Sequence, residues 1–261
     1  MTRPDSPDRP TVLAFAHRGG AYHPEIEGLE NTMAAFRHAV SLGYRHLETD
    51  VHVTRDGVLL AFHDTVLDRV TDRVGPIAET SYAEVQQALI GGRERVPTLA
   101  ELFDAFPAAR FNIDLKSHGA VEALAGFLDE RAAWDRVVVG SFSVRRMRAF
   151  RARTAGRVAT SAHPLEVAAY VVLPSARLAR RLTRDRPRVL QVPHRRGRLV
   201  VASSGLVRRA HANGLDVHVW TIDDPDEMHL LLDRGVDGLM TDRTDILRDV
   251  LRSRGLWEEP S

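Results

Sequence analysis

The stretch that organises this sequence reads Glu48-Thr49-Asp50-Val51-His52-Val53-Thr54-Arg55-Asp56-Gly57-Val58-Leu59-Leu60-Ala61-Phe62-His63-Asp64. Asp56-Gly57 lies between two segments rich in apolar and β-branched residues, which is the pattern of a β-hairpin with a two-residue loop. Because so short a loop cannot cross over between parallel strands, we expect the residues from Val58 to His63 to run antiparallel to the strand before them.

The register of this hairpin follows from its loop. A two-residue loop pairs Arg55 with Val58, and the ladder then places Asp50 directly opposite His63 on one face. Alternation along the strand puts Glu48 on the same face as Asp50. The pattern predicts that two carboxylates and an imidazole converge, although a bulge would shift the register by one residue and turn His63 to the other face. A solvated polar face is the alternative interpretation.

Length and composition indicate one large globular domain. The 261 residues are 44% hydrophobic and 27% charged, which allows a full core and suits a barrel of strands and helices of about 250 residues. The formal net charge of +1 gives no general attraction to nucleic acid, so no nucleic-acid partner is expected. The absence of cysteine excludes disulfides and is compatible with a reducing, cytoplasmic location. Residues 1–11 are expected to form a disordered tail, and their lack of an apolar core argues against a signal peptide or a membrane span.

Strand-like and helix-like segments alternate through the chain. Strands are predicted at residues 12–17, 45–53, 110–116, 136–142, 157–162, 188–193, 216–222 and 238–242. Helices are predicted at residues 31–42, from 97 onward, and at 120–131, 144–153, 165–181, 203–212, 225–233 and 245–252, with Asn31 as the N-cap of the first. Eight such units are the number in a closed (β/α)8 barrel, so we predict an α/β fold of the TIM-barrel type. We expect the domain over residues 12–255, with a small insertion after the second strand at about residues 55–97.

In a barrel of this type the active site lies at the carboxyl ends of the strands and in the loops that follow them. The polar residues at or near those ends are His17, Glu48, Asp50, Asp114, Lys116, Trp220 and Asp242. Lys116 is the single lysine among 36 lysine and arginine residues, which hints at a position that needs a compact ammonium group. An ion pair between Asp114 and Lys116 in a packed barrel is the alternative, but three carboxylates at one mouth favour a site.

The carboxylates Glu48, Asp50 and Asp114 predict a metal site. Without a cysteine partner they describe a site for a hard cation, Mg²⁺ or Ca²⁺. Carboxylates this close together need a cation or shared protons to coexist.

Two histidines and two cations complete the predicted site. His17 and His63 approach the same mouth from different segments, as an acid and a base on opposite sides of a reacting centre must. Arg18 and Lys116 add positive charge for an anionic, phosphorylated ligand. Together with a metal, these groups predict hydrolysis of a phosphodiester.

The motifs that carry these residues resemble, in order, those of the glycerophosphodiester phosphodiesterase family. They are His17-Arg18-Gly19, Glu30-Asn31-Thr32, Glu48-Thr49-Asp50-Val51, Thr54-Arg55-Asp56-Gly57, His63-Asp64, Asn112-Ile113-Asp114-Leu115-Lys116, Val219-Trp220-Thr221, Gly235-Val236-Asp237-Gly238 and Thr241-Asp242. The match runs from about residue 12 to residue 250. It implies a phospholipase-C-like phosphodiesterase barrel that cleaves a glycerophosphodiester to glycerol 3-phosphate and an alcohol.

The resemblance also implies residue roles. The implied metal ligands are Glu48, Asp50 and Asp114; the implied acid and base are His17 and His63; and the implied substrate contacts are Arg18 and Lys116 at the phosphate and Trp220 at the glycerol. Glu30 and Asn31 resemble the turn that supports the first loop. Asp114 departs from the family pattern, in which the third ligand is commonly glutamate; the shorter side chain can alter metal choice or affinity but is not expected to abolish ligation. The nucleophile is either water or the glycerol 2-hydroxyl, which would give a cyclic phosphate first.

The sequence alone leaves alternative functions open. The stretch from Arg177 to Arg198 contains nine arginines after an apolar run, and could meet anionic lipid and favour a lysophospholipid substrate, as in a lysophospholipase D. A solvated helix face and loop is the favoured interpretation, so membrane contact is not favoured. A non-catalytic phosphate-binding barrel is disfavoured because both histidines and all three carboxylates are present.

Overall fold

Eight parallel strands form the centre of the computed structural model, which describes residues 12–173, 175–183 and 187–259. They are β1 (Leu13–Ala16), β2 (His46–Val53), β6 (Arg110–Leu115), β7 (Val137–Gly140), β8 (Ala159–Thr160), β9 (Val189–Pro193), β12 (Asp216–Trp220) and β13 (Gly238–Thr241). Their order is β8-β7-β6-β2-β1-β13-β12-β9, and a parallel bridge between Ser161 and Val189 joins the two ends of this order. The predicted (β/α)8 barrel is confirmed. The predicted tail at residues 1–11 lies outside the described residues.

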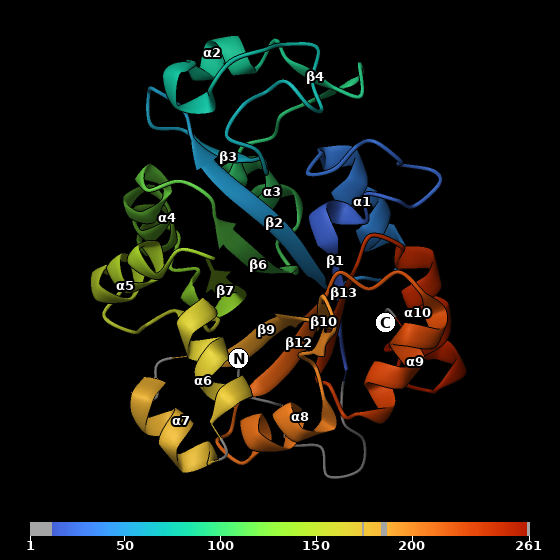
Figure 1. Cartoon of the computed structure of the whole chain (residues 1–261). Coiled ribbons are helices and arrows are strands. Elements are labelled where there is room, and N and C mark those ends of the chain that lie inside the picture. The colour runs from blue at the N-terminus through green and yellow to red at the C-terminus, as the bar shows by residue number, and fades with distance from the viewer. Residues whose placement is uncertain (1–11, 174, 184–186, 260–261) are drawn as a thin grey trace.

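Helices surround the strands (Figure 1). They are α1 (Met33–Ser41), α3 (Leu99–Ala105), α4 (Gly119–Glu130), α5 (Val144–Arg153), α6 (Pro164–Val172), α7 (Ala176–Thr183), α8 (Ser204–His211), α9 (Pro225–Asp233) and α10 (Thr244–Ser253). Apolar faces of these helices pack on the outward side chains of the strands, which are buried on both sides of the barrel wall. Within the described residues, none of the helices combines the length and the apolar character needed to cross a membrane.

The helix predicted at residues 165–181 is wrong as a single element. The structure has two helices there, α6 and α7, which are separated around Leu173. Pro174 follows Leu173 in the sequence, and a proline in a helix interior removes a hydrogen bond and clashes with the preceding turn.

Asn31 is not the N-cap of α1. Thr32 takes that position, and its side chain accepts a hydrogen bond from the amide of Ala35. Asn31 instead has a φ angle of 58° and directs its side chain to the strand β2, where it donates to Asp50 and accepts from Thr49. The turn at Glu30 and Asn31 therefore connects the first loop to β2, the strand that carries Glu48 and Asp50.

The predicted hairpin register is wrong by one residue. The strand β3 (Leu59–Ala61) is antiparallel to β2 as expected, but Val51 pairs with Ala61, so Phe62 rather than His63 lies across from Asp50. The loop has three residues, 55–57, and ends in Gly57 with a φ angle of 87°. Three-residue hairpin loops of this kind need glycine in the left-handed region.

Side-chain hydrogen bonds favour this longer loop. The Thr54 hydroxyl donates to Asp56 over 2.6 Å and accepts from the amide of Val58 over 3.0 Å. The Asp56 carboxylate also accepts from the amide of Tyr82, over 2.9 Å. These bonds close the loop around Thr54 and connect it to the segment that follows β3.

Between β3 and α3 the chain forms a separate small layer, seen above the barrel in Figure 1. It contains the turn η2 (Ile77–Glu79), the helix α2 (Tyr82–Val85) and the short antiparallel strands β4 (Leu89–Ile90) and β5 (Glu94–Arg95). Its own apolar cluster is built from Leu60, Phe62, Leu67, Ile77, Val85, Ala88, Ile90 and Val96. Because Leu60 and Phe62 belong to the hairpin, this cluster fixes the position at which the chain passes from β3 to His63.

Candidate active site

The first loop of the site is the turn η1 (His17–Gly19), directly after β1. Arg18 has a φ angle of 50° and Gly19 one of 88°, both in the left-handed region. A Cβ atom on Gly19 would lie 2.6 Å from the Cβ atom of Ala35, so glycine is required for this turn to pack against α1. The turn holds His17 and Arg18 at the carboxyl end of β1.

The three candidate ligand carboxylates lie on the adjacent strands β2 and β6. The strand register pairs Asp50 with Asp114, and Glu48 shares the face of Asp50 by alternation. Glu48 is 5% exposed and Asp50 is 1% exposed, while the Asp114 side chain is 13% exposed. The structure therefore brings the three predicted carboxylates to one part of the mouth.

Cations of the protein pair with these carboxylates. Asp50 lies 3.1 Å from Nε of Arg18 and 3.0 Å from Nζ of Lys116. The same Lys116 ammonium lies 2.7 Å from Asp114. Glu48 accepts a hydrogen bond from the backbone amide of Arg18 over 3.1 Å. The Asp114–Lys116 ion pair considered from the sequence is thus present, as part of a larger charged cluster.

Two of the three carboxylates have raised pKa values. Burial raises the pKa of Glu48 to about 7, and the charge of Asp50 acts in the same direction. Burial also raises the pKa of Asp114 to about 6, although Lys116 opposes the change. The Oδ1 atom of Asp114 is buried and has no hydrogen-bond partner among the described residues.

The donor set fits a hard divalent cation. As the side chains stand, no group of three or more His, Asp or Glu residues in the described chain is arranged to hold a metal ion. The Lys116 ammonium contacts both Asp50 and Asp114. The Asp114 oxygen without a partner is free to accept a cation, and carboxylate oxygens are the ligands that Mg²⁺ and Ca²⁺ prefer.

His17 is held by the carboxylate of Asp242, which directly follows β13. Its Nδ1 atom lies 2.8 Å from Oδ1 of Asp242, and its Nε2 atom lies 3.8 Å from Glu48. Burial acts to lower the pKa of His17, but Glu48 and the hydrogen bond to Asp242 outweigh it and raise the pKa to about 9. Asp242 therefore fixes the ring so that Nε2 faces the carboxylate cluster.

His63 reaches the site after the chain has left β3. Its Nδ1 atom lies 2.6 Å from Oδ1 of the neighbouring Asp64, and its backbone oxygen is 3.1 Å from Nε2 of His52. Burial lowers the pKa of His63, and the charge of Asp50 opposes this change. The direct pairing of His63 with Asp50 predicted from the hairpin is wrong, and the two residues are related only through the effect of the Asp50 charge on the pKa of His63.

Arg69 connects the two loops that carry the site. Its guanidinium lies 2.5 Å from Asp64, the partner of His63, and contacts both carboxylate oxygens of Glu30 at 2.6 and 2.8 Å. Glu30 in turn lies 3.1 Å from Arg18. A continuous chain of ion pairs therefore runs from the His63 segment through Arg69 to the first loop.

Aromatic side chains form another edge of the mouth. Trp220, at the end of β12, meets the ring of Phe142 edge-on at a centroid distance of 5.5 Å. The ammonium of Lys116 lies 5.9 Å from the centroid of the Phe142 ring. Trp220, predicted to contact the glycerol group, is thus close to the charged cluster by way of Phe142.

Four further residues hold this site together: Asp64, Arg69, Phe142 and Asp242. Asp242 is predicted at the mouth and Asp64 lies in the His63-Asp64 motif, but the sequence does not indicate that these carboxylates bind the two histidines. Arg69 and Phe142 carry no local signal, because their contacts join segments that are distant in the sequence.

Comparisons with known proteins agree with these observations. The model of the glycerophosphoryl diester phosphodiesterase family matches residues 17–246. The Mycobacterium tuberculosis protein named "Probable glycerophosphodiester phosphodiesterase 2" is 41% identical over 249 residues, which cover 94% of this chain and 93% of that protein. Human "Lysophospholipase D GDPD1" is 28% identical over 287 residues, covering 92% of this chain and 86% of that protein.

A solved structure shows the same fold. A phosphodiesterase of Oleispira antarctica, in complex with the product sn-glycerol-3-phosphate, superposes with a TM-score of 0.78. The sequence identity is 24%, and the superposition covers 93% of this chain and 97% of that one. The fold of this chain is therefore shared with that protein.

Proposed function

The chain belongs to the glycerophosphoryl diester phosphodiesterase family and is a phosphoric diester hydrolase, and we propose that it cleaves its substrate at the mouth formed by β1, β2 and β6. The observation that carries this placement is the arrangement of the two histidines. His17 and His63 each have Nδ1 bound to a carboxylate, beside a cluster of buried acidic and basic groups. Glycerol 3-phosphate and an alcohol are the products of this reaction.

Glu48, Asp50 and Asp114 are the residues that would hold a divalent cation, Mg²⁺ or Ca²⁺, in a family that is generally metal-dependent. When bound, such an ion supplies Lewis-acid polarisation of a phosphoryl oxygen and neutralises negative charge that develops there. The unpaired Oδ1 atom of Asp114 supports this assignment.

The histidines act as the acid and base pair. With Nδ1 held by Asp242 in one case and Asp64 in the other, each ring presents Nε2 for proton transfer. One histidine takes a proton from the nucleophile, and the other gives a proton to the departing alkoxide. Neither a free alkoxide, which is a strong base, nor a protonated nucleophile, which is a strong acid, is then formed.

Three further side chains bind the substrate in this proposal. Arg18 and Lys116 contact the phosphoryl oxygens, since both cations are 17% exposed at the mouth and are held in place by Asp50. Trp220 packs on the glycerol group, as its partly exposed ring beside Phe142 permits. These contacts orient the phosphorus atom between the two imidazoles.

The nucleophile is water or the glycerol 2-hydroxyl, and the two are distinguished by time-resolved phosphorus NMR during turnover. Transient glycerol cyclic phosphate identifies the 2-hydroxyl as the nucleophile. We also propose that the protein is cytoplasmic, and the cysteine-free sequence is compatible with this location. Immunodetection in fractionated cells of the source organism would test it.

Product identification tests the proposed function. With glycerophosphocholine as substrate, we expect glycerol 3-phosphate and choline in equal amounts. Glycerol and phosphocholine instead would mean that the other ester bond is broken, which would contradict the assignment. Protein in which His17 and His63 are both replaced by glutamine serves as the control for contaminating hydrolases.

A further inference from the structure

The solvent-facing side of the helix α6 is apolar. Leu165 is 63% exposed and Val172 is 75% exposed, and Ala168 between them is exposed as well. These residues lie three and four positions apart, so they share one face of the helix. Surface helices of globular proteins normally direct polar residues to the solvent, so an apolar outer face indicates a contact surface.

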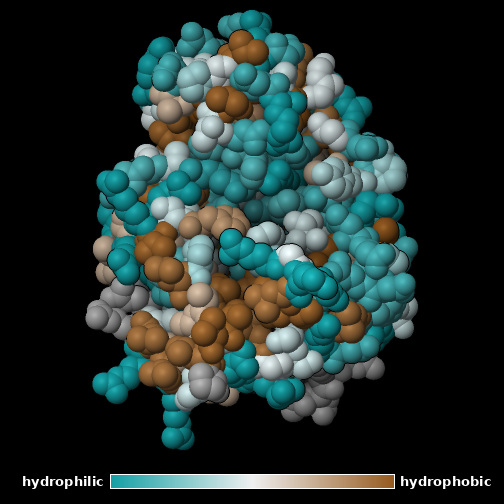
Figure 2. Space-filling view, viewed as in Figure 1, coloured by the Kyte–Doolittle hydropathy of each residue, from teal (hydrophilic) through white to brown (hydrophobic). Residues whose placement is uncertain are grey.

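The neighbouring helix α7 continues this apolar surface. Leu178 is 44% exposed and Leu182 is 62% exposed, and because they are four residues apart they lie on one side of the helix. The helices α6 and α7 pack against each other, and Figure 2 shows the hydrophobic area that covers this part of the molecule. We call this surface the α6–α7 face and define it by the side chains of Leu165, Val172, Leu178 and Leu182.

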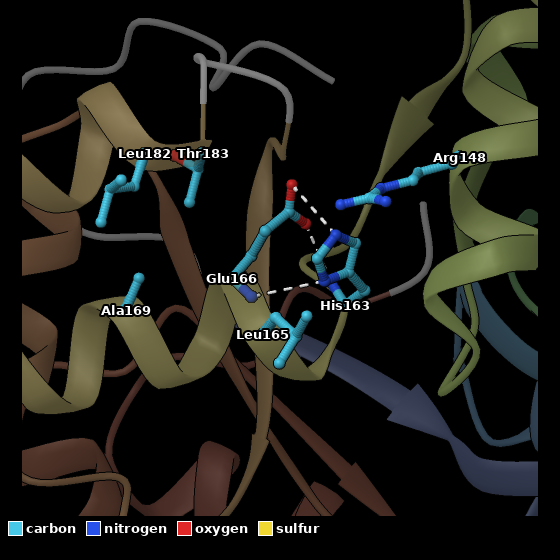
Figure 3. Close-up of a pocket in the computed structure, with 7 residues that line it drawn as sticks. All are labelled: Arg148, His163, Leu165, Glu166, Ala169, Leu182 and Thr183. Carbon is cyan, nitrogen blue, oxygen red and sulfur yellow. Dashed lines mark hydrogen bonds and ion pairs between the residues drawn. The ribbon is translucent and has the colours of Figure 1, made fainter.

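A pocket separates the two helices at this face. It has a volume of about 510 Å³, and its apolar wall is formed by Leu165 and Ala169 of α6 and by Leu182 of α7. Figure 3 shows these side chains on the two sides of the opening. Leu165 and Leu182 therefore do not cover each other, and both remain open to a partner.

Arginines border the apolar side chains. Arg177 and Arg181 are exposed, and each directly precedes one of the exposed leucines of α7. Because successive residues are about 100° apart around a helix, each of these arginines lies beside a leucine. Arg148 of α5 adds a further cation at the wall of the pocket (Figure 3). The α6–α7 face thus combines apolar surface with positive charge.

The two helices expose no carboxylate. Glu166 is the only acidic residue of α6 and α7, and it is 6% exposed. Its carboxylate accepts two hydrogen bonds from the guanidinium of Arg151, at 2.7 and 2.9 Å. An anionic surface that approaches these helices therefore meets arginines and no exposed acidic side chain.

We propose that the α6–α7 face binds the surface of an anionic lipid membrane. The leucines enter the boundary between headgroups and acyl chains, and the arginines contact the lipid phosphates. Long arginine side chains extend along apolar surface while their charged ends stay at the headgroups, so one face can make both kinds of contact. This binding is independent of which substrate the protein cleaves.

A second copy of the chain fits this face less well. In a symmetric dimer the same patch lies on both subunits, so the arginines of one copy would lie against those of the other. Like charges that meet at an interface are unfavourable. The arginine-rich stretch by itself favours a solvated face, and the exposed apolar side chains beside it are what favour a lipid surface instead.

Vesicle sedimentation tests the proposal. The full-length protein is mixed with vesicles of phosphatidylglycerol and phosphatidylcholine in equal parts, and with vesicles of phosphatidylcholine alone. We expect binding to the anionic vesicles to be about tenfold stronger or more, and to weaken several-fold as the salt concentration rises from about 50 to about 500 mM. Equal binding to both kinds of vesicle, or no binding to either, would overturn the proposal.

Two double variants separate the apolar part of the face from the charged part. Leu165→Asn with Leu182→Asn should weaken binding to the anionic vesicles about tenfold or more, because apolar contact area is lost. Arg177→Gln with Arg181→Gln should also weaken it about tenfold or more, because each arginine near an anionic surface strengthens binding roughly fivefold. Circular dichroism verifies that both variants keep the fold.

Matched controls carry the same kinds of change elsewhere. Val74→Asn with Leu230→Asn replaces exposed apolar side chains, and Arg73→Gln with Arg93→Gln replaces exposed arginines of the inserted layer. Both controls should bind within about twofold of wild type. A loss of equal size in the controls, or wild-type binding in either variant of the α6–α7 face, would overturn the proposal.

Sedimentation equilibrium without lipid tests the other occupant. We expect a monomer in the wild type and in the double leucine variant. A wild-type dimer that the double leucine variant abolishes would show that a second copy covers the face, and would also overturn the proposal.

Discussion

The Nδ1 atom of His17 lies 2.8 Å from Oδ1 of Asp242, although the two residues are 225 positions apart in the chain. Asp242 is itself fixed, because its backbone amide donates to Asp223 over 2.8 Å. The first and last strands of the barrel, β1 and β13, are neighbours. The loops that follow them therefore bring together His17, one member of the acid and base pair, and its partner Asp242.

Asp242→Asn should lower kcat by about tenfold or more, with a smaller change in KM, because an amide can hold His17 in the wrong tautomer and does not stabilise its cationic form. Steady-state kinetics with glycerophosphocholine measure this effect. Asp224→Asn, a change at the exposed cap of α9, provides a control that should leave kcat unchanged. Equal kcat values for wild type and Asp242→Asn would show that this hydrogen bond does not serve the reaction.

His17→Ala and His63→Ala should each lower turnover by on the order of 10²- to 10⁴-fold, because each removes a positioned proton donor or acceptor. Release of glycerol 3-phosphate measures the loss, and circular dichroism verifies that the fold is kept. Near-normal turnover in either variant would remove that histidine from the mechanism.

Arg69→Lys should lower kcat several-fold, since lysine keeps the charge but cannot hold Asp64 and Glu30 with a planar, forked group. Because the effect acts through the position of His63, the free energy of unfolding should be the same in the variant and in the wild type. Arg73→Lys, in the same inserted layer and exposed, is the matched control. If both variants lose the same activity, the Arg69 network has no specific role in positioning His63.

Because of His218, we predict that the free energy of unfolding depends on pH. Its ring is buried in the barrel, neither nitrogen has a hydrogen-bond partner among the described residues, and burial lowers the pKa to about 3. An unfolded chain binds a proton at this residue below pH of about 6.5, whereas the folded chain does not, so the free energy of unfolding falls as the pH falls from about 6.5 toward 3.

Between pH 7 and pH 5, His218→Leu should therefore lose about 2 kcal/mol less of its free energy of unfolding than the wild type does. Urea unfolding at the two pH values measures the difference. His118→Leu changes an exposed histidine and should behave as the wild type. The same pH dependence in wild type and His218→Leu would contradict the assignment of a neutral buried ring.

The sequence allowed the barrel to be predicted because strand and helix patterns alternate at regular intervals along the chain. Each predicted parallel strand overlaps one in the structure. The hairpin register was wrong because the side chain of Thr54 and the left-handed Gly57 favour a three-residue loop, an energetic choice that the Asp56-Gly57 pattern does not specify. The broken helix between Pro164 and Thr183 was missed because its apolar pattern continues past Pro174.

The candidate site was predictable to the extent that its residues lie at strand ends. Alternation along the strands and the order of the strands are enough to place Glu48, Asp50 and Asp114 at the mouth, and both can be recognised from local sequence patterns. The partners that orient the histidines were not predictable in the same way, since Asp242 and Arg69 meet their partners only through the closed barrel and the inserted layer.

The most direct test of the central claim is release of glycerol 3-phosphate from glycerophosphocholine by chelator-stripped protein, before and after Mg²⁺, Ca²⁺ or Mn²⁺ is added back. We predict little release from the stripped protein and restored release with at least one of these ions, which would also identify the metal that the carboxylates accept. Full activity of the stripped protein, or no release with any ion from protein shown to be folded, would contradict the account.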